Sequence, residues 1–342
     1  MNIRLGLDSG AHSLYKLVFS RTDSGAKVQR EHVTFEYVDT PRFRQYLDAY
    51  MEFLLERGKD FDFYVNLDII MSAEKSIEVQ KIMEREGLTP LPVFHLNEPW
   101  EYWKRYADSY SYIGLGGLGQ DIPMERFMPF GDKAFKYIMD KGRPRVKVHG
   151  FAVNAVAMLK RFPYYSVDAS SWTTFARNGV ICIPVPIWKN RNVIGFTYLK
   201  PPYAVPVGDR SMHKTKHLTN QFELPKRVIE QYIRDCGFEP EQAKEYWVRD
   251  IINIKFYLGI ERELKDYYAE RFNFPEGGNV YLAGQPSASS TIPSFRRIST
   301  HFPEGVKYLP TFFYKKHMSI LLDLQKTVER RRLSLPRRRL AV

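Results

Sequence analysis

The chain has 342 residues, of which 44% are hydrophobic and 26% are charged. These proportions are typical of a soluble globular protein, so disorder is not the default expectation except at the end of the chain. Lys and Arg outnumber Asp and Glu by 51 to 39, a net charge of +12, which favours a polyanionic partner, most simply nucleic acid.

Short runs of β-branched and aromatic residues alternate with helical stretches along the first half of the chain. Strands are expected at 3–7, 63–69, 92–96, 110–115, 146–151, 164–167 and 180–185. Helices are expected between them, at 41–57, 73–86, 99–107, 131–141 and 154–161. This alternation predicts a parallel sheet, either closed as a (β/α)8 barrel or open and doubly wound.

Nearly every expected strand ends in a polar residue or a glycine. These strand-end residues are Asp8, Asp68, His95, Gly116, Gly117, His149 and Asp168. A barrel gathers the carboxyl ends of its strands around one mouth, whereas an open sheet spreads them along a crevice. No GxGxxG follows the first strand, which counts against a dinucleotide-binding fold. The expected fold is therefore an α/β protein of the (β/α)8 TIM-barrel type.

The pattern changes after residue 185. A Pro-, Gly- and Lys-rich passage at 188–217 predicts a hairpin or long loop, and helices are expected at 225–237, 239–258 and 259–270. A strand at 279–283 is the candidate for the eighth barrel strand, and 315–332 has the pattern of a terminal amphipathic helix. The expected divisions are 1–185 with seven βα units and the active site, 186–290 with helices and the last strand, and 291–342 as a basic C-terminal elaboration.

The tail ERRRLSLPRRRLAV concentrates arginines in two runs. They are Arg330, Arg331, Arg332, Arg337, Arg338 and Arg339. Such a cluster predicts a solvated arm that contacts phosphates, and a tail that only increases solubility explains the same composition.

Two cysteines occur, Cys182 and Cys236, which excludes a disulfide framework and favours a reducing compartment. The opening MNIRLGLDSG lacks the plan of a signal peptide, and no apolar run is long enough to span a bilayer. The sequence therefore predicts a cytoplasmic protein with no membrane partner.

Three short motifs contain the residues suited to chemistry. LGLDSGAHS places Asp8 at a strand end, where a helix N-cap explains the aspartate equally well. YIGLGGLGQ offers a glycine backbone against which a planar ligand can lie, or simply a turn. YYSVDASSW places Asp168 after an apolar strand, where a capping or salt-bridged aspartate is the alternative. Two carboxylates at one barrel mouth suit glycosidic chemistry, one attacking the anomeric carbon and one moving protons.

Taken in order, LDSGAHSLY, YIGLGGLGQ, VHGFAVNAVAMLKRFPYYSVDASSW and FARNG resemble the tRNA-guanine transglycosylase superfamily. The resemblance covers roughly residues 1–185. It is closer to the DNA-acting branch, the DpdA-like 7-deazaguanine transglycosylases of bacterial DNA-modification clusters and phages. It implies that guanine in DNA is exchanged for a 7-deazaguanine base, such as 7-cyano-7-deazaguanine, without a cofactor.

The resemblance also implies a role for each matching position. Asp168 is the implied nucleophile, and Asp8 is the implied acid and base. The implied base-binding residues are Asp68, His95, Gly116, Gly117, Leu118, Ser9, Gly10 and His149, with Tyr15, Phe151 or Trp172 against the faces of the base. Arg177 and Asn178 of FARNG join the tail arginines as implied nucleic-acid contacts.

The chain lacks the CxCxxC zinc run of the tRNA-acting enzymes. Cys182, Cys236, His213 and His217 could form a rearranged site, but free buried cysteines and solvent-facing histidines are the simpler interpretation, so no metal is expected. Three alternative functions stay open: exchange on tRNA, a catalytically silent barrel that binds nucleic acid or a protein through its basic C-terminal region, and an ordinary glycoside hydrolase. The last is disfavoured because no sugar-binding pattern of carboxylates and Trp is evident.

Overall fold

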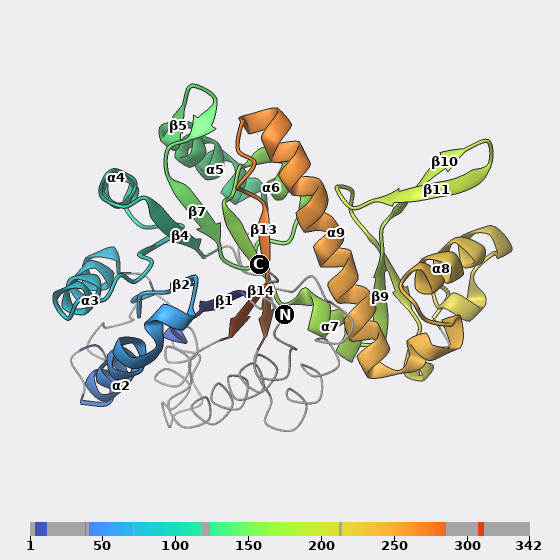
Figure 1. Cartoon of the computed structure of the whole chain (residues 1–342), viewed down its shortest axis with the longest axis horizontal. Coiled ribbons are helices and arrows are strands. Elements are labelled where there is room, and N and C mark those ends of the chain that lie inside the picture. The colour runs from blue at the N-terminus through green and yellow to red at the C-terminus, as the bar shows by residue number, and fades with distance from the viewer. Residues whose placement is uncertain are drawn as a thin grey trace, which may run out of the picture.

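The structure is a computed structural model that describes residues 4–11, 38, 41–70, 72–117, 124–211, 214–284 and 307–310. Its fold is mixed α/β (Figure 1). The α-helices are α2 (Pro41–Arg57), α3 (Ala73–Arg85), α4 (Trp100–Ser109), α5 (Met124–Ile138), α6 (Val156–Arg161), α7 (Ser171–Arg177), α8 (Glu223–Asp235) and α9 (Tyr246–Phe272). Among these described helices, none is both long and apolar enough to cross a lipid bilayer.

A parallel sheet of eight strands is the centre of the fold. Its strands are β1 (Arg4–Leu7), β2 (Phe63–Tyr64), β3 (Val93–His95), β4 (Tyr112–Gly116), β7 (Lys147–Gly150), β8 (Ser166–Ala169), β13 (Asn279–Gly284) and β14 (Lys307–Pro310). They pair in the order β2-β1-β14-β13-β8-β7-β4-β3, and every neighbouring pair is parallel. Next to the two strands at the ends of this order, Val65 and Leu91 form an isolated parallel bridge outside the named strands. Two hydrogen bonds accompany this bridge, from Leu91 N to Tyr64 O at 2.7 Å and from Asn66 N to Leu91 O at 2.9 Å.

The sheet is strongly curled, and aromatic rings fill its concave face. The ring of Phe63 on β2 lies 5.5 Å from that of Tyr112 on β4, 5.1 Å from His149 on β7 and 5.2 Å from Tyr281 on β13. In the strand order, β2 and β4 are six steps apart, which in a flat sheet amounts to about 29 Å at roughly 4.8 Å per step. Contact between their rings therefore requires that the sheet bend back on itself.

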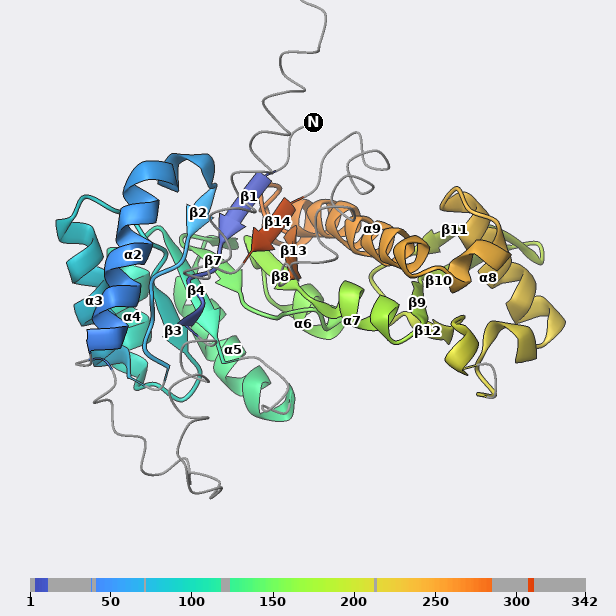
Figure 2. The same ribbon diagram turned by 90° about the horizontal axis from the view of Figure 1, so that it is seen from below.

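Helices cover the convex face, and their sequence pattern explains why. In α2 the side chains of Phe43, Leu47, Tyr50 and Leu54 recur at spacings of three and four and are all buried. They pack with Leu7 and with residues of α3 in one hydrophobic cluster. Figure 2 shows α2, α3 and α4 gathered on one side of the sheet, while α9 extends toward the other end of the molecule.

A second region extends from the sheet beyond α7. It contains β9 (Val180–Ile183) paired antiparallel with β12 (Tyr203–Pro206), the β10 (Val185–Lys189) and β11 (Asn192–Thr197) hairpin, and α8. The expectation of a seventh parallel strand at 180–185 is therefore wrong. This stretch does form a strand, β9, but β9 pairs with β12 and lies outside the eight-stranded sheet.

Two further expectations are corrected by the structure. The strand expected at 279–283 is confirmed as β13, but it is the seventh parallel strand, and β14 follows it. The separate helices expected at 239–258 and 259–270 are mostly one helix, α9. Gly259 does not interrupt α9; instead it makes room for Tyr198, because a Cβ there would lie 2.3 Å from the Tyr198 ring. Tertiary packing thus outweighs the low helix propensity of glycine. The expected helix at 315–332 lies outside the described residues.

Candidate active site

Asp8 directly follows β1, in a turn that Gly10 completes. Gly10 has a φ of 79°, which favours glycine, and its N–H donates to Asp8 Oδ1 at 3.5 Å. Ser9 is buried, and its carbonyl accepts a hydrogen bond from the Tyr46 hydroxyl at 2.9 Å. Burial raises the pKa of Tyr46, and the negative charge of Asp8 raises it further. These contacts hold Asp8 against α2 at the carboxyl end of β1.

Asp68 and His95 follow β2 and end β3, and the structure brings them together. His95 Nε2 lies 2.7 Å from Asp68 Oδ2, and Asp68 is 7% exposed. Burial acts to lower the pKa of His95, but the hydrogen bond and the charge of Asp68 raise it overall. Gly116 borders the same ring, since a Cβ there would lie 2.9 Å from His95 atoms. The strand-end residues of β2, β3 and β4 therefore form one contact group.

Glu98 is a further member of this group that the sequence did not suggest. Its Oε2 accepts the backbone N–H of His95 at 2.9 Å, while its Oε1 is buried without a hydrogen-bond partner among the described residues. Burial raises the pKa of Glu98 to about 7, His95 lowers it, and the charge of Asp68 adds to the rise. A carboxyl group that titrates near neutrality thus lies next to the Asp68–His95 pair.

Asp168 lies on β8, opposite Tyr281 of β13 in the parallel register, and is 7% exposed. Its Oδ1 accepts the backbone N–H of Ala152 at 2.8 Å and lies 3.5 Å from Nε2 of His149. Ala152 has a φ of 57°, a left-handed conformation that is costly for a residue with a Cβ. Backbone strain of this kind persists where the surroundings fix it, and here it aims an N–H at the carboxylate.

His149 supports Asp168 from behind. The imidazole is fully buried, and its Nδ1 lies 2.6 Å from Ser166 Oγ, which in turn lies 2.6 Å from the Tyr112 hydroxyl. His149, which the resemblance predicts to bind the base, instead contacts Asp168, Ser166 and neighbouring aromatic rings. Direct contact with a substrate would require exposed atoms, so we interpret His149 as a residue that positions Asp168.

One further side chain links the two halves of the site. The ring of Phe151 lies 4.5 Å from that of His149, and it also fills the space beside Gly114, where a Cβ would lie 2.6 Å from it. Gly114 and Gly116 are two residues apart on β4 and therefore face the same side of the sheet. The contacts run from Asp68 through His95, β4 and Phe151 to His149 and Asp168, all at the carboxyl ends of parallel strands.

Several predicted residues are not brought into this group. Gly117 is exposed and adopts a φ of 77° beyond β4. Trp172 is buried and donates its indole N–H to Ala283 O at 2.9 Å, so it packs in the core. Arg177 and Asn178 are exposed at the end of α7. The remaining predicted positions, Leu118, Tyr15 and the six tail arginines, lie outside the described residues.

The rearranged metal site has no support in the described part of the chain. Cys182 and Cys236 are buried, and burial raises the pKa of each thiol to about 12, which disfavours the thiolate that a metal needs. His217 is buried, with Nδ1 2.8 Å from the Thr219 hydroxyl. Across the described ranges, no group of three or more His, Cys, Asp or Glu side chains is arranged to hold a metal ion. His213 lies outside them.

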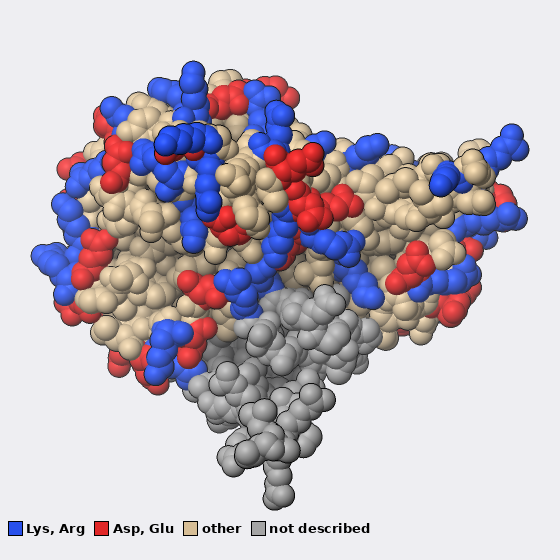
Figure 3. All heavy atoms as spheres, turned by 45° about the horizontal axis from the view of Figure 1, so that its top comes forward, with Lys and Arg blue, Asp and Glu red and all other residues tan. Residues whose placement is uncertain are grey.

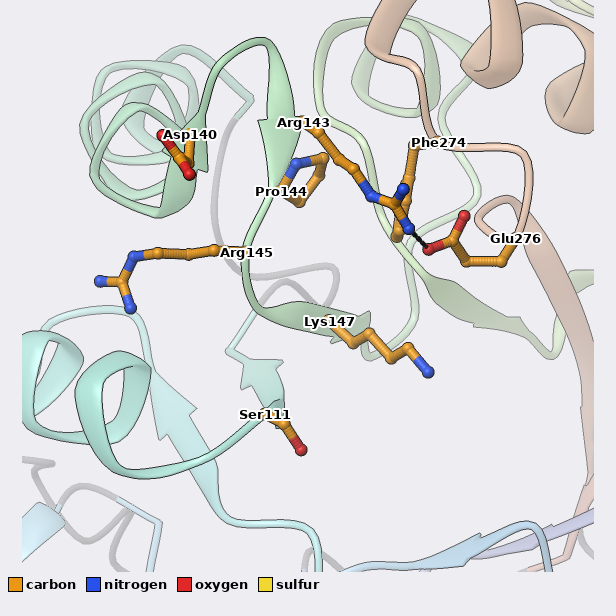
Figure 4. Close-up of a pocket in the computed structure, with 8 residues that line it drawn as sticks. All are labelled: Ser111, Asp140, Arg143, Pro144, Arg145, Lys147, Phe274 and Glu276. Atoms are coloured by element: carbon orange, nitrogen blue, oxygen red, sulfur yellow. Dashed lines mark hydrogen bonds and ion pairs between the residues drawn. The ribbon is translucent and has the colours of Figure 1, made fainter.

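A pocket of about 350 Å³ lies at the other end of the strands, near the start of β7. It is lined by Ser111, Asp140, Arg143, Pro144, Arg145, Lys147, Phe274 and Glu276 (Figure 4). Arg143 pairs with Glu276, and Arg145 points away from them to pair with Asp108. None of the predicted site residues borders this pocket, so it is separate from the candidate active site.

Ser166 and Ala152 are site residues that were not predicted from the sequence, and only Ser166 has a sequence pattern that could have indicated it. Ser166 lies two residues before Asp168 on the same strand, so the period of a strand places both on one face. Nothing in the sequence marks Ala152, because alanine rarely adopts a positive φ.

Comparison of the chain with protein-family models, curated proteins and solved structures finds no match.

Proposed function

We propose that this protein is a transglycosylase that exchanges guanine in DNA for a 7-deazaguanine base through a covalent glycosyl-aspartate intermediate. The observation that carries the proposal is the arrangement of three aspartates, Asp8, Asp68 and Asp168, at the carboxyl ends of strands of one parallel sheet. Two of them have supporting contacts that suit distinct roles. Asp168 is held by an N–H and an imidazole, and Asp68 is paired with a histidine.

We infer that the scaffold is a closed (β/α)8 barrel. The parallel bridge between Val65 and Leu91 joins the two end strands, and the ring contacts of Phe63 cross the concave face from β2 to β4, β7 and β13. The eight strands also pair in chain order around this circle, as barrel topology requires. Asp8 follows β1, which lies between β2 and β14 in the strand order. Closure would bring Asp8 to the same end of the barrel as Asp168.

In the proposed reaction, the target guanosine leaves its stack and Asp168 attacks C1′ of the sugar. The bond from C1′ to N9 breaks, and guanine departs with a proton supplied by Asp8. The incoming 7-deazaguanine then gives its N9 proton to Asp8, and its N9 attacks C1′ and displaces Asp168. Two displacements at one carbon retain its configuration. One glycosidic bond replaces another, so the exchange requires no nucleotide energy source.

The Asp68–His95 pair suits recognition of the base edge. Guanine and its 7-deaza analogues present N–H donors on the pyrimidine edge, and a carboxylate accepts such bonds strongly. A protonated His95 would compensate the buried charge of Asp68 and fix its orientation through the 2.7 Å contact. The backbone of β4 at Gly116 offers further polar atoms near the same ring.

Mass spectrometry of nucleosides tests the proposal. Purified protein is incubated with 7-cyano-7-deazaguanine and either duplex DNA or tRNA, and the polymers are then digested. We expect a 7-deazaguanine deoxynucleoside from DNA, and its loss by more than about 10³-fold in Asp168→Asn, because an amide is a poor nucleophile. Asp132→Asn, at an exposed aspartate paired with Arg161, is the matched control and should retain full exchange.

The outcomes separate the alternatives. Product in tRNA alone would favour the tRNA-acting alternative, which the same carboxylates would serve. Full exchange in folded Asp168→Asn would contradict the assignment of the nucleophile. The assay is repeated with radiolabelled guanine as the incoming base. If neither base is incorporated into DNA or tRNA, the alternative of a catalytically silent protein that binds nucleic acid is favoured.

A further inference from the structure

The β10–β11 hairpin, which we call the arm, projects from the body of the protein (Figure 1). Its base is firmly attached. Glu263 of α9 accepts hydrogen bonds from Thr197 Oγ1 at 3.0 Å and from the N–H groups of Tyr198 and Leu199 at 2.9 and 3.1 Å. The Phe196 ring also lies 5.1 Å from Tyr232 of α8. The arm is therefore presented from a fixed base.

The outer half of the arm exposes large apolar side chains. Ile187 is 43% exposed, Trp188 45% and Ile194 60%. These residues are close together, because Trp188 pairs with Val193 and Ile187 with Gly195 in the hairpin register. Clustered exposed apolar residues of this kind mark interaction surfaces more often than isolated ones do.

The tip of the arm holds a cation in an unfavourable backbone conformation. Asn190 and Arg191 form the two-residue turn, with φ values of 49° and 65°. Hairpin turns of this type favour Asn followed by Gly, because both residues need a positive φ. Arg191 stands where glycine would relieve strain. Arg191 and the neighbouring Lys189 are both exposed at the end of the arm.

The charge of this stretch is uniformly positive. From 169 to 208 the sequence contains Arg177, Lys189, Arg191 and Lys200 but no Asp or Glu. Within the described part of the chain, neither Lys189 nor Arg191 forms an ion pair. Figure 3 shows Lys and Arg side chains at the end of the projection. These cations have no carboxylate among their sequence neighbours and flank an exposed indole, a combination that complements a strand of phosphates and bases.

We propose that the arm is a nucleic-acid-binding element in which Lys189 and Arg191 contact phosphates and Trp188 packs against a base or sugar. This inference rests on the proposed function, since it names the surface that holds the polymer. A protein partner explains the exposed apolar side chains of the arm. It does not explain the two cations at the tip or the lack of any carboxylate from 169 to 208.

Fluorescence anisotropy of full-length protein with dye-labelled DNA, single-stranded and duplex, tests the proposal over a range of salt concentrations. K189A/R191A should weaken binding about tenfold or more at 0.1 M salt and reduce the slope of log K against log salt by about 1.8 for duplex DNA. K59A/K81A is the matched control, because Lys59 and Lys81 are exposed cations near α2 and on α3, at the opposite end of the molecule. It should leave both quantities close to wild type.

Two single variants separate the contributions of the arm. W188A should weaken binding to single-stranded DNA by about tenfold with an unchanged salt slope, since it removes contact area but no charge. R191G should raise Tm by about 1 °C through relief of the positive φ, while weakening DNA binding and reducing the slope by about 0.9. A residue with a purely structural role would not show opposite effects on stability and binding.

The result that overturns the proposal is a DNA affinity and salt slope in K189A/R191A equal to those of wild type. A change of oligomeric state in W188A by sedimentation velocity, with unchanged DNA affinity, would also overturn it in favour of contact between copies of the chain. Failure of the proposed function is distinguishable. If the protein exchanges bases but the arm variants bind DNA like wild type, only the role of the arm is contradicted. If the arm variants lose DNA binding but the wild type exchanges no base, only the proposed reaction is contradicted.

Discussion

Glu98 is a residue of the site whose pKa lies near neutral pH. Its pKa is raised from 4.5 to about 7 by burial, so the folded protein binds a proton there that the unfolded chain releases at lower pH. The free energy of unfolding should therefore fall as pH rises from 4.5 to 7. His95 acts in the same direction at higher pH, because its raised pKa contributes stability that is present below 6.5 and lost above the folded value.

We expect Glu98→Gln to remove the first part of this pH dependence, since glutamine keeps an oxygen for the His95 N–H but does not titrate. Urea unfolding at intervals between pH 4.5 and 8 would measure it. The stability of the variant relative to wild type should increase steadily up to about pH 7 and then level off. Glu101→Gln, at an exposed glutamate on α4, serves as the control. Parallel curves for wild type and Glu98→Gln would contradict the assignment.

Single residues also show where prediction from the sequence stops. Asp68 and His95 were expected at strand ends, and the structure places them in contact. Their partner Glu98 was not expected, because its position depends on the turn that follows β3. Ala152 gave no signal, since its role comes from a backbone conformation that only the surrounding structure can impose.

At the level of elements, one buried side chain of α9 bonds to both β9 and α7. Asn253 Oδ1 accepts the Cys182 N–H at 2.8 Å, and its Nδ2 lies 3.1 Å from Trp172 O and 3.2 Å from Val180 O. The amide thus satisfies backbone groups of β9 and α7 that are buried away from water. It holds α7, which begins just after Asp168, against the long helix.

Asn253→Ala should lower the free energy of unfolding by about 3 kcal/mol, because it removes the side-chain acceptor of the buried Cys182 N–H and the amide donor of two carbonyls. Chemical denaturation followed by circular dichroism measures this loss. Glu270→Ala, on an exposed position of the same helix, should change stability by less than about 0.5 kcal/mol. A similar small effect for Asn253→Ala would show that water replaces these hydrogen bonds.

Periodicity predicted most elements of the first half because hydrophobic spacing there matches local structure. It was wrong where the partner of a strand decided its role, as at 180–185, and where packing outweighed propensity, as at Gly259. It did not reveal β14, a strand of four residues whose pairing with β1 and β13 joins segments far apart in the chain. Such contacts have no local signature.

At the scale of the whole molecule, the proposed chemistry depends on how the sheet ends meet. An open sheet of this strand order would separate Asp68 near β2 from His95 on β3 by seven inter-strand spacings, or roughly 34 Å. Their 2.7 Å contact and the Val65–Leu91 bridge instead bring residues next to the two end strands together. The candidate site therefore includes residues next to both end strands, and the inferred closure of the sheet is a condition for base recognition as proposed.

Amide hydrogen exchange tests this closure directly. In a closed barrel, the Leu91 N–H bonded to Tyr64 O and the Asn66 N–H bonded to Leu91 O belong to an internal ladder. Their protection factors should lie within about tenfold of that of Tyr165, whose N–H bonds to Val148 O between β7 and β8. The exposed Gly142 between β5 (Met139–Asp140) and β6 (Arg143–Pro144) provides the unprotected reference. Exchange of Leu91 and Asn66 as fast as Gly142, in folded protein with Tyr165 protected, would mean that β2 and β3 are sheet edges, and the inferred barrel would be wrong.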